Sequence, residues 1–241
     1  MLKNILKIGI IILSLFQFSS SAALNITAQS WLVANHDGTV ILSENANEVR
    51  SIASITKLLT VIAILDAKQP LNDRVNQYTR KELIQLALIK SDNKSAQVLC
   101  EKYPGGSKEC IIAINSKIAQ LGLTKTKIIE PTGLSVFNVS TAMELIKIVQ
   151  LASTYPEIVE ASKTSQIKIQ IKKKLFIFNN TNPIIGRRHE FIVSKTGYFN
   201  ASGGCIVMML NTDIGRRIVV VLGSKNTHTR IPEAEFIADY L

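Results

Sequence analysis

Three short motifs in this 241-residue chain combine residue types that can carry out nucleophilic catalysis. In chain order they are Ser54-Ile55-Thr56-Lys57, Ser91-Asp92-Asn93 and Lys195-Thr196-Gly197. Each motif alone is weak, because a serine three residues before a lysine arises by chance and Ser91 by itself is typical of a helix cap. Their occurrence together, in this order, is far more specific than any one of them.

The spacing of Ser54 and Lys57 predicts a nucleophile beside its base. Positions i and i+3 of a helix share one face, so Lys57 can contact the Ser54 hydroxyl if both lie at the start of the apolar helix expected over 58–65. A lysine accepts a proton only when neutral, and burial in that helix together with a second cation, Lys195, is expected to lower its pKa. The alternative, a surface lysine in a first helical turn, is disfavoured by the apolar residues that follow.

The third motif is expected to complete an oxyanion hole. The backbone N–H of Ser54, at a helix N-terminus, supplies one donor. The second donor requires an edge strand, and Lys195-Thr196-Gly197 follows the strand-like residues 190–194. Gly197 would let a substrate lie close to the backbone, so we expect the N–H of Tyr198 to be the second donor. Alone, this motif would indicate only a cationic strand end with a turn glycine.

Composition and the N-terminus indicate an exported, folded, basic protein. With 46% apolar residues and a formal charge of +10, the chain is neither a disordered tail nor a collagen-like repeat. Lys3 and Lys7 precede an apolar run and small residues ending at Ala23, which predicts a signal peptide over 1–23; an uncleaved anchor is the alternative. Residues 24–241 suit a single domain without an integral membrane segment. Its charge favours anionic lipid or wall polymers, and no nucleic-acid motif is present.

The cysteines and histidines give little support for metal chemistry. Cys100 and Cys110 flank a turn-forming stretch, a spacing equally compatible with a disulfide and with two reduced, buried thiols. Cys205 lies in an apolar run and is expected in the core. No histidine has the spacing of a metal ligand or a serine–histidine triad, and a surface position is favoured for all three. The histidines are His36, His189 and His228.

Hydrophobic periodicity predicts an α+β fold in two lobes. Strands are expected over 31–34, 39–42, 166–172, 190–196, 205–210 and 217–222. Helices are expected over 58–65, 81–89, 110–121 and 233–241, with Thr141 and Glu144 forming a capping box for one more. The strands at both chain ends must then share one antiparallel sheet. We therefore expect a sheet lobe over about 24–53 and 165–241 and a helical lobe over about 54–164, with the site between them.

The motifs make this sequence resemble the serine D-alanyl-D-alanine peptidases of the low-molecular-mass penicillin-binding type, most closely the penicillin-binding protein 7 group of D,D-endopeptidases. Further similarity lies in Ser51-Ile52-Ala53 before Ser54, in Glu130-Pro131-Thr132-Gly133-Leu134-Ser135, and in Lys195-Thr196-Gly197-Tyr198. The resemblance implies the serine β-lactamase/DD-peptidase (transpeptidase-like) fold. It also implies a periplasmic location, peptidoglycan stem peptides as substrates, no cofactor, and β-lactam antibiotics as covalent inhibitors.

The same resemblance implies roles for individual residues. Ser54 would be acylated, Lys57 would be its base, and Ser91 would pass a proton to the leaving group. Asn93 would hold the substrate amide, while Lys195 and Thr196 would bind its carboxylate. Arg230 looks like an arginine that some relatives use for that carboxylate, although a surface position is equally compatible with its context. The resemblance thus assigns Asn93, Lys195, Thr196 and Arg230 to substrate binding.

Two other functions stay open at the level of sequence. A β-lactamase would need a deacylating glutamate, and Glu130 lies 39 residues after Ser91, about where such a residue could sit. Class A enzymes have an asparagine four residues after that glutamate, whereas this chain has Leu134, which favours the peptidase. A non-catalytic penicillin sensor or wall-binding module is the other alternative, and it would have no need for a base beside Ser54. The choice between endopeptidase and carboxypeptidase depends on loop shape.

Overall fold

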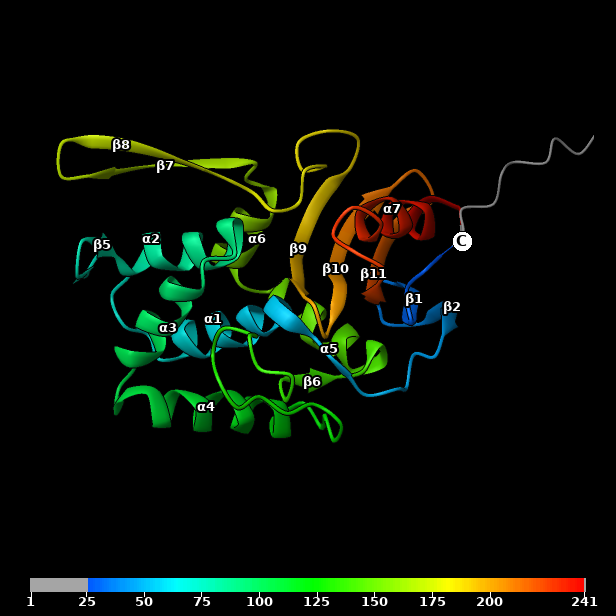
Figure 1. The fold of residues 1–241 in the computed structure, drawn as a ribbon, viewed down its shortest axis with the longest axis horizontal. Coiled ribbons are helices and arrows are strands. Elements are labelled where there is room, and N and C mark those ends of the chain that lie inside the picture. Colours follow the sequence, from blue (N-terminus) through cyan, green and yellow to red (C-terminus); the bar gives the residue numbers. More distant parts are fainter. Residues whose placement is uncertain (1–25, 241) are drawn as a thin grey trace, which may run out of the picture.

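The computed structural model describes residues 26–240 (Figure 1). The signal peptide expected over 1–23 lies outside the described residues and stays a prediction. None of the helices in the described range is long and apolar enough to cross a membrane.

A five-stranded antiparallel sheet is built from both ends of the chain, as expected. Its strand order is β2-β1-β11-β10-β9, so the N-terminal hairpin joins the last three strands. The strand bounds are β1 Ser30–Asn35, β2 Val40–Glu44, β9 Glu190–Phe199, β10 Gly203–Thr212 and β11 Gly215–Ser224. Strand β9 is the edge strand that faces the helical part of the molecule (Figure 1).

Side chains alternate between the two faces of the sheet, as strand geometry requires. On β1, Leu32 and Ala34 belong to the larger core cluster shared with α1 and α5, whereas Trp31 and Val33 belong to a smaller one completed by α7. The C-terminal helix α7 (Arg230–Tyr240) begins at Arg230, earlier than the expected start at residue 233. Helices therefore cover both faces of the sheet (Figure 1).

The middle of the chain is mainly helical, as predicted. The helices are η1 Ala53–Ile55, α1 Thr56–Asp66, α2 Arg80–Gln85, η2 Leu86–Lys90, α3 Asn93–Glu101, α4 Gly106–Gln120, α5 Ala142–Ala152 and α6 Pro156–Lys163. Short antiparallel pairs join β3 (Arg50–Ser51) to β6 (Val139–Ser140) and β4 (Arg74–Val75) to β5 (Tyr78–Thr79). The segment expected over 81–89 is an α-helix that continues as one turn of π-helix, η2.

One predicted strand lies outside the main sheet. Strand β7 (Gln166–Ile171) pairs only with β8 (Lys174–Asn179), in a two-stranded hairpin that extends over α2 (Figure 1). The expectation that this segment belongs to the sheet was wrong, because its alternating pattern is satisfied by burying Ile167 and Ile169 against the larger core cluster. The prediction that its lysines form a solvated face is confirmed for Lys168, which is exposed.

The local predictions about capping are corrected in part. Thr141 caps α5 by accepting the N–H of Glu144 at 3.1 Å, but the Glu144 carboxylate accepts N–H groups from Thr124 and Lys125 instead of closing a capping box. A complete capping box occurs at Thr79 and Glu82, at the start of α2. The backbone N–H groups of this nearby loop need hydrogen-bond acceptors, and they bind the carboxylate that would otherwise close the capping box of α5.

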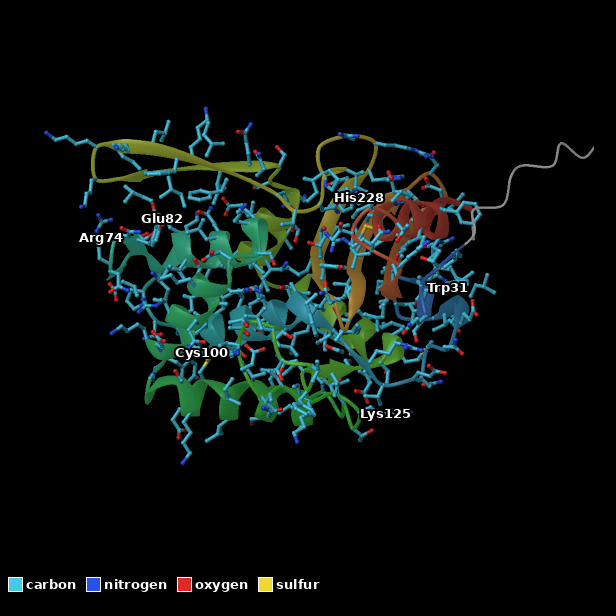
Figure 2. The ribbon with its side chains drawn as sticks, viewed as in Figure 1. Trp31, Arg74, Glu82, Cys100, Lys125 and His228 are labelled. Carbon is cyan, nitrogen blue, oxygen red and sulfur yellow. A yellow bond between two sulfur atoms is a disulfide. The ribbon has the colours of Figure 1, made fainter. Side chains whose placement is uncertain are left out.

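The cysteine and histidine predictions have mixed outcomes. Cys100 and Cys110 form a disulfide that joins α3 to α4, with their Cα atoms 5.4 Å apart (Figure 2). Cys205 is free and buried, as predicted. His36 and His228 are exposed, but His189 is buried, with its Nε2 atom 3.2 Å from the carboxylate of Asp239, so the surface interpretation was wrong for His189.

Candidate active site

Ser54 and Lys57 lie together where the sheet meets the helical lobe. Ser54 is the middle residue of η1, which leads directly into α1, and Lys57 is in the first turn of α1. The Lys57 ammonium nitrogen Nζ lies 2.8 Å from the Ser54 hydroxyl oxygen Oγ, confirming the contact predicted from the i, i+3 spacing. The Lys57 side chain is fully buried, whereas Ser54 is partly accessible.

Lys57 is surrounded by oxygen atoms. Besides Ser54, its Nζ donates to Asn93 Oδ1 at 2.7 Å and to the carbonyl oxygen of Thr132 at 2.6 Å. Burial lowers the pKa of Lys57 to about 8, although the charges of Glu130 and Asp92 oppose that shift. The predicted lowering of its pKa is confirmed with burial as the cause; the charge of Lys195 is not among the causes at Lys57.

Ser91 and Lys195 form the second half of the site. Ser91 directly follows η2 and has a left-handed backbone, with φ of 59°, and its Oγ accepts a hydrogen bond from Lys195 Nζ at 2.8 Å. The Lys195 side chain is buried and also donates to the carbonyl oxygen of Thr196. Burial, followed by repulsion from Lys57 and Arg230, holds the pKa of Lys195 well below its usual value.

The Lys195-Thr196-Gly197 motif occupies the edge strand β9, where an extended substrate can add as a further strand. Gly197 also has a role in packing within the protein, beside the substrate contact expected from the sequence, which stays a prediction. A Cβ atom at Gly197 would lie 2.9 Å from the backbone nitrogen of Ser54, so the glycine allows β9 to approach η1. The next residue, Tyr198, has an exposed side chain.

Arg230 is buried, so the surface interpretation was wrong. It is the first residue of α7, and its guanidinium donates to the carbonyl oxygen of Gly197 at 2.6 Å. Burial lowers the pKa of Arg230, and its Nε atom has no hydrogen-bond partner among the described residues. The structure therefore places Arg230 beneath the edge strand, where it holds the Gly197 peptide group.

A loop that the motifs did not identify as part of the site lies on the other side of Lys57. The carboxylate of Glu130 accepts N–H groups from Thr132, Gly133 and Ser135, and the side-chain amide of Asn138. These hydrogen bonds fold residues 130–138 so that the Thr132 carbonyl faces Lys57. Because Thr132 lies 75 positions from Lys57 in the chain, no local spacing could have revealed this contact.

Two unusual backbone conformations support this arrangement. Ala53, immediately before Ser54, has a φ of 47°, a left-handed conformation that is costly for a residue with a Cβ. Gly133, with φ of 83°, packs so closely on it that a Cβ at Gly133 would lie 2.0 Å from the Ala53 carbonyl oxygen. The left-handed turn at Ala53 thus fixes the direction of Ser54, and only glycine fits against it.

The residues predicted for catalysis are thus brought together. Within the described range, no group of residues is suited to hold a metal ion. A serine hydroxyl beside a buried lysine of lowered pKa can act as a nucleophile with its base. A second hydroxyl held by another lysine, next to an open strand edge, can transfer protons to a bound acyl substrate. The geometry is that of an acyl-transfer site.

Comparison with known proteins agrees with this geometry. The family model described as D-alanyl-D-alanine carboxypeptidase, Peptidase S11, matches residues 17–76 and 69–226. The chain belongs to the S11 peptidase family. It is therefore a serine hydrolase, and the resemblance seen in its motifs is confirmed.

Curated relatives of this S11 peptidase carry a narrower name. The D-alanyl-D-alanine endopeptidase of Escherichia coli is 32% identical over 238 residues, covering 89% of this chain and 77% of the relative. The D-alanyl-D-alanine endopeptidase of Pseudomonas aeruginosa is 33% identical over 227 residues, covering 85% of this chain and 73% of the relative.

Solved structures show the same fold. The Streptomyces K15 DD-transpeptidase matches with a TM-score of 0.83 and 23% identity, over 89% of this chain and 96% of that one. Penicillin-binding protein D2 from Listeria monocytogenes, in its ampicillin-bound form, matches with a TM-score of 0.80 and 22% identity, over 89% and 97%. The predicted α+β DD-peptidase fold is confirmed.

Proposed function

We propose that this S11 peptidase is exported to the periplasm and cleaves D-alanyl peptide bonds in the crosslinks of peptidoglycan, as a D,D-endopeptidase. The observation that carries the proposal is the 2.8 Å contact between Ser54 Oγ and the buried Nζ of Lys57. The names of the relatives from Escherichia coli and Pseudomonas aeruginosa favour an endopeptidase over a carboxypeptidase.

In the first chemical step, the Ser54 hydroxyl oxygen attacks the carbonyl carbon of the penultimate D-alanine. Its proton passes to neutral Lys57, and a C–O bond forms. Negative charge on the carbonyl oxygen is stabilised by the backbone N–H groups of Ser54 and Tyr198. Collapse of this intermediate breaks the C–N bond and leaves an ester on Ser54.

The leaving amine needs a proton, and Ser91 is suited to provide it. Its hydroxyl can give its own proton to the amine and accept the one held by Lys57, so no net charge is created. Lys195, which donates to Ser91 Oγ at 2.8 Å, fixes the direction of that hydroxyl. Water then attacks the ester while Lys57 removes its proton, and the serine hydroxyl is regenerated.

Substrate binding is assigned to the groups that surround these atoms. The extended peptide would lie along β9, with Asn93 holding its amide opposite the strand. Lys195 and Thr196 would hold the substrate carboxylate; Thr196 Oγ1 lies 2.6 Å from Thr181 Oγ1. Arg230 supports the carboxylate indirectly, through its hydrogen bond to Gly197, and adds positive charge beneath the site.

β-Lactams are proposed to acylate the same serine. The β-lactamase alternative requires Glu130 to activate water, but its carboxylate is already the acceptor of several hydrogen bonds within its own loop. That use favours slow hydrolysis of the penicilloyl ester, which is the behaviour of a penicillin-binding protein rather than a β-lactamase. A non-catalytic sensor is disfavoured because both Ser54 and its base are in place.

The test is digestion of purified cross-linked muropeptide dimers and of uncross-linked pentapeptide muropeptides, followed by chromatography and mass spectrometry. The proposal predicts conversion of dimers to monomers by the native protein and none by Ser54→Ala. Release of terminal D-alanine alone would make the protein a carboxypeptidase. Absence of both reactions, with the protein folded, would overturn the proposed activity.

A further inference from the structure

The hydroxyl of Thr196, in the third motif, is paired with a residue that belongs to none of the motifs. Its Oγ1 atom lies 2.6 Å from Oγ1 of Thr181, and either hydroxyl can be the donor. Thr181 lies in the segment between β8 and β9. Within the described residues, each of these two hydroxyls has the other as its one hydrogen-bond partner. The pair therefore adds one residue to the surroundings of the active site.

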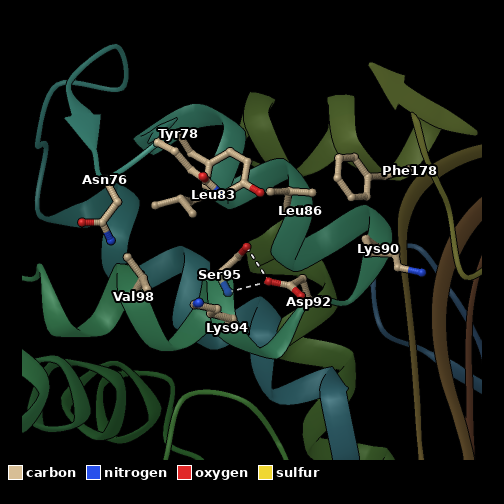
Figure 3. Close-up of a pocket in the computed structure, with 11 residues that line it drawn as sticks. Asn76, Tyr78, Leu83, Leu86, Lys90, Asp92, Lys94, Ser95, Val98 and Phe178 are labelled. Carbon is tan, nitrogen blue, oxygen red and sulfur yellow. Dashed lines mark hydrogen bonds between the residues drawn. The ribbon is translucent and has the colours of Figure 1, made fainter. Parts of the chain in front are cut away.

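Thr181 joins the segments that carry the second and third motifs. Its backbone N–H donates to the carbonyl oxygen of Ile89 at 3.0 Å, two residues before Ser91, while its side chain reaches β9. The end of β8 also contacts η2, where Phe178 and Leu86 line the same pocket (Figure 3). The Thr181 hydroxyl is thus held between η2 and the edge strand.

Two asparagines fix the backbone on either side of Thr181. The side-chain amide of Asn180 donates to the carbonyl oxygen of Thr164 at 2.9 Å, and its Oδ1 atom accepts the N–H of Asn182 at 2.9 Å. Asn182 is buried, and its own amide donates to Ser194 Oγ on β9 at 2.9 Å. These hydrogen bonds restrict the backbone at Thr181, so its hydroxyl is preorganised against β9.

Two basic side chains lie around Thr196. Lys195 Nζ donates to the Thr196 carbonyl oxygen at 2.7 Å, and the Arg230 guanidinium donates to that of Gly197 at 2.6 Å. Both side chains are buried, and neither forms an ion pair with a carboxylate in the described part of the chain. A substrate carboxylate placed here supplies the missing counter-charge and favours their charged forms.

Such a carboxylate decides the direction of the threonine pair. An ionised carboxylate only accepts hydrogen bonds, so Thr196 must point its proton toward it. The Thr196 oxygen can then accept the proton of Thr181, and this hydrogen bond polarises the Thr196 hydroxyl and makes it a better donor. In the reverse arrangement, Thr196 donates to Thr181 and has no proton left for the substrate.

We propose that Thr181 is a positioning residue that favours substrates with a carboxylate beside the scissile bond, by directing the Thr196 hydroxyl toward that carboxylate. The inference rests on the proposed function, and it deepens the account of substrate binding at the same site. Thr181 is not among the hydrogen-bond partners of Lys57 Nζ. Its effect is therefore on binding of the carboxylate and not on the base.

The test compares variants of Thr181 with two forms of one acylating agent, benzylpenicillin and its methyl ester, in which the carboxylate is masked. Thr181→Val keeps the side-chain shape and removes the hydroxyl, whereas Thr181→Ser keeps the hydroxyl. The matched control is Thr154→Val, because the exposed Thr154 donates to the Leu151 carbonyl oxygen at 2.8 Å, at the end of α5. Second-order rate constants of acylation are measured for each protein, with circular dichroism as the check of folding.

The proposal predicts that Thr181→Val reacts with benzylpenicillin about tenfold more slowly than the native protein, and with the methyl ester at the native rate. Thr181→Ser and Thr154→Val should keep the native rates with both compounds. When Thr196→Val is already present, Thr181→Val should cause no further loss, because the hydroxyl through which it acts is gone. The midpoint of the rise of acylation with pH should not move, because that rise belongs to Lys57.

A native rate with benzylpenicillin in folded Thr181→Val would overturn the proposal. So would an equal loss with the two compounds, or additive losses in the double variant, because Thr181 would then support the fold of the site without acting through Thr196. Thr181→Ala carries the same predictions and replaces the valine variant if that protein does not fold. Failure of the native protein to react with benzylpenicillin would instead count against the proposed function.

Discussion

Lys57 Nζ lies 2.8 Å from Ser54 Oγ while its own side chain is completely removed from solvent. Burial disfavours the ammonium form, and among the hydrogen-bond partners of Nζ in the described residues Ser54 Oγ is the one oxygen that carries a proton. The lysine is therefore prepared to accept a proton from Ser54. The pairing also explains how the protein can activate a serine without a histidine.

The pH dependence of acylation follows from that burial. Because only neutral Lys57 can accept a proton and its pKa is about 8, the rate of acylation by benzylpenicillin should rise with pH and level off above about 8. At pH 7 roughly a tenth of the protein has the neutral base. Stopped-flow acylation between pH 5.5 and 9.5 measures the profile. A rate that falls as pH rises through 8 would show that Lys57 acts in its charged form.

Replacing Lys57 by arginine tests the same group in another way. Arginine remains protonated at all accessible pH values, so Lys57→Arg should slow acylation by about 10²- to 10⁴-fold. The rise with pH should also vanish from the remaining activity. Circular dichroism is needed beside the kinetics, because the larger guanidinium must fit a buried position. A folded variant that keeps the native rate would contradict the assignment of the base.

Glu130 distinguishes the peptidase from the β-lactamase. Its carboxylate organises the loop that presents the Thr132 carbonyl to Lys57, so Glu130→Gln should slow acylation. Hydrolysis of the penicilloyl ester, measured by mass spectrometry after removal of free drug, should continue at its native slow rate. A variant that acylates normally and then fails to deacylate would show that Glu130 activates water.

Gly133 is predicted to be essential for stability. Gly133→Ala would combine a left-handed conformation with a contact of 2.0 Å to the Ala53 carbonyl oxygen, which cannot move without moving Ser54. Gly122→Ala is the matched control, since Gly122 has φ of 66° but no atom within 4 Å of an added Cβ. The control should lose about 1–2 kcal/mol of unfolding free energy in urea denaturation, and Gly133→Ala clearly more. Equal losses would contradict the close packing.

The parts of the site that could be predicted from sequence are the local ones. The relation of Ser54 to Lys57 is fixed by helix geometry, and the edge-strand position of Gly197 follows from the strand pattern before it. The hairpin of β1 and β2 and the buried helix α1 were predictable for the same reason. Each of these depends on residues that are close together in the chain.

The remainder depends on contacts between distant segments. The carbonyl of Thr132 reaches Lys57 across 75 positions, and the left-handed turn at Ala53 occurs at an ordinary alanine. The alternation in β7 predicted a strand but could not identify its partner, because a half-buried pattern fits a sheet edge and a separate hairpin equally well. Arg230 gave no sign of burial, since its environment is created only when α7 packs against β10 and β11 and its guanidinium reaches the carbonyl of Gly197.

The central claim is that Ser54 is acylated with the help of Lys57. The most direct test is the intact mass of the purified protein after incubation with benzylpenicillin, with peptide mapping of the adduct. We predict one penicilloyl group, located on Ser54, that forms slowly in Lys57→Ala and is absent from Ser54→Ala. An adduct on another residue, or none on a folded native protein, would contradict the account.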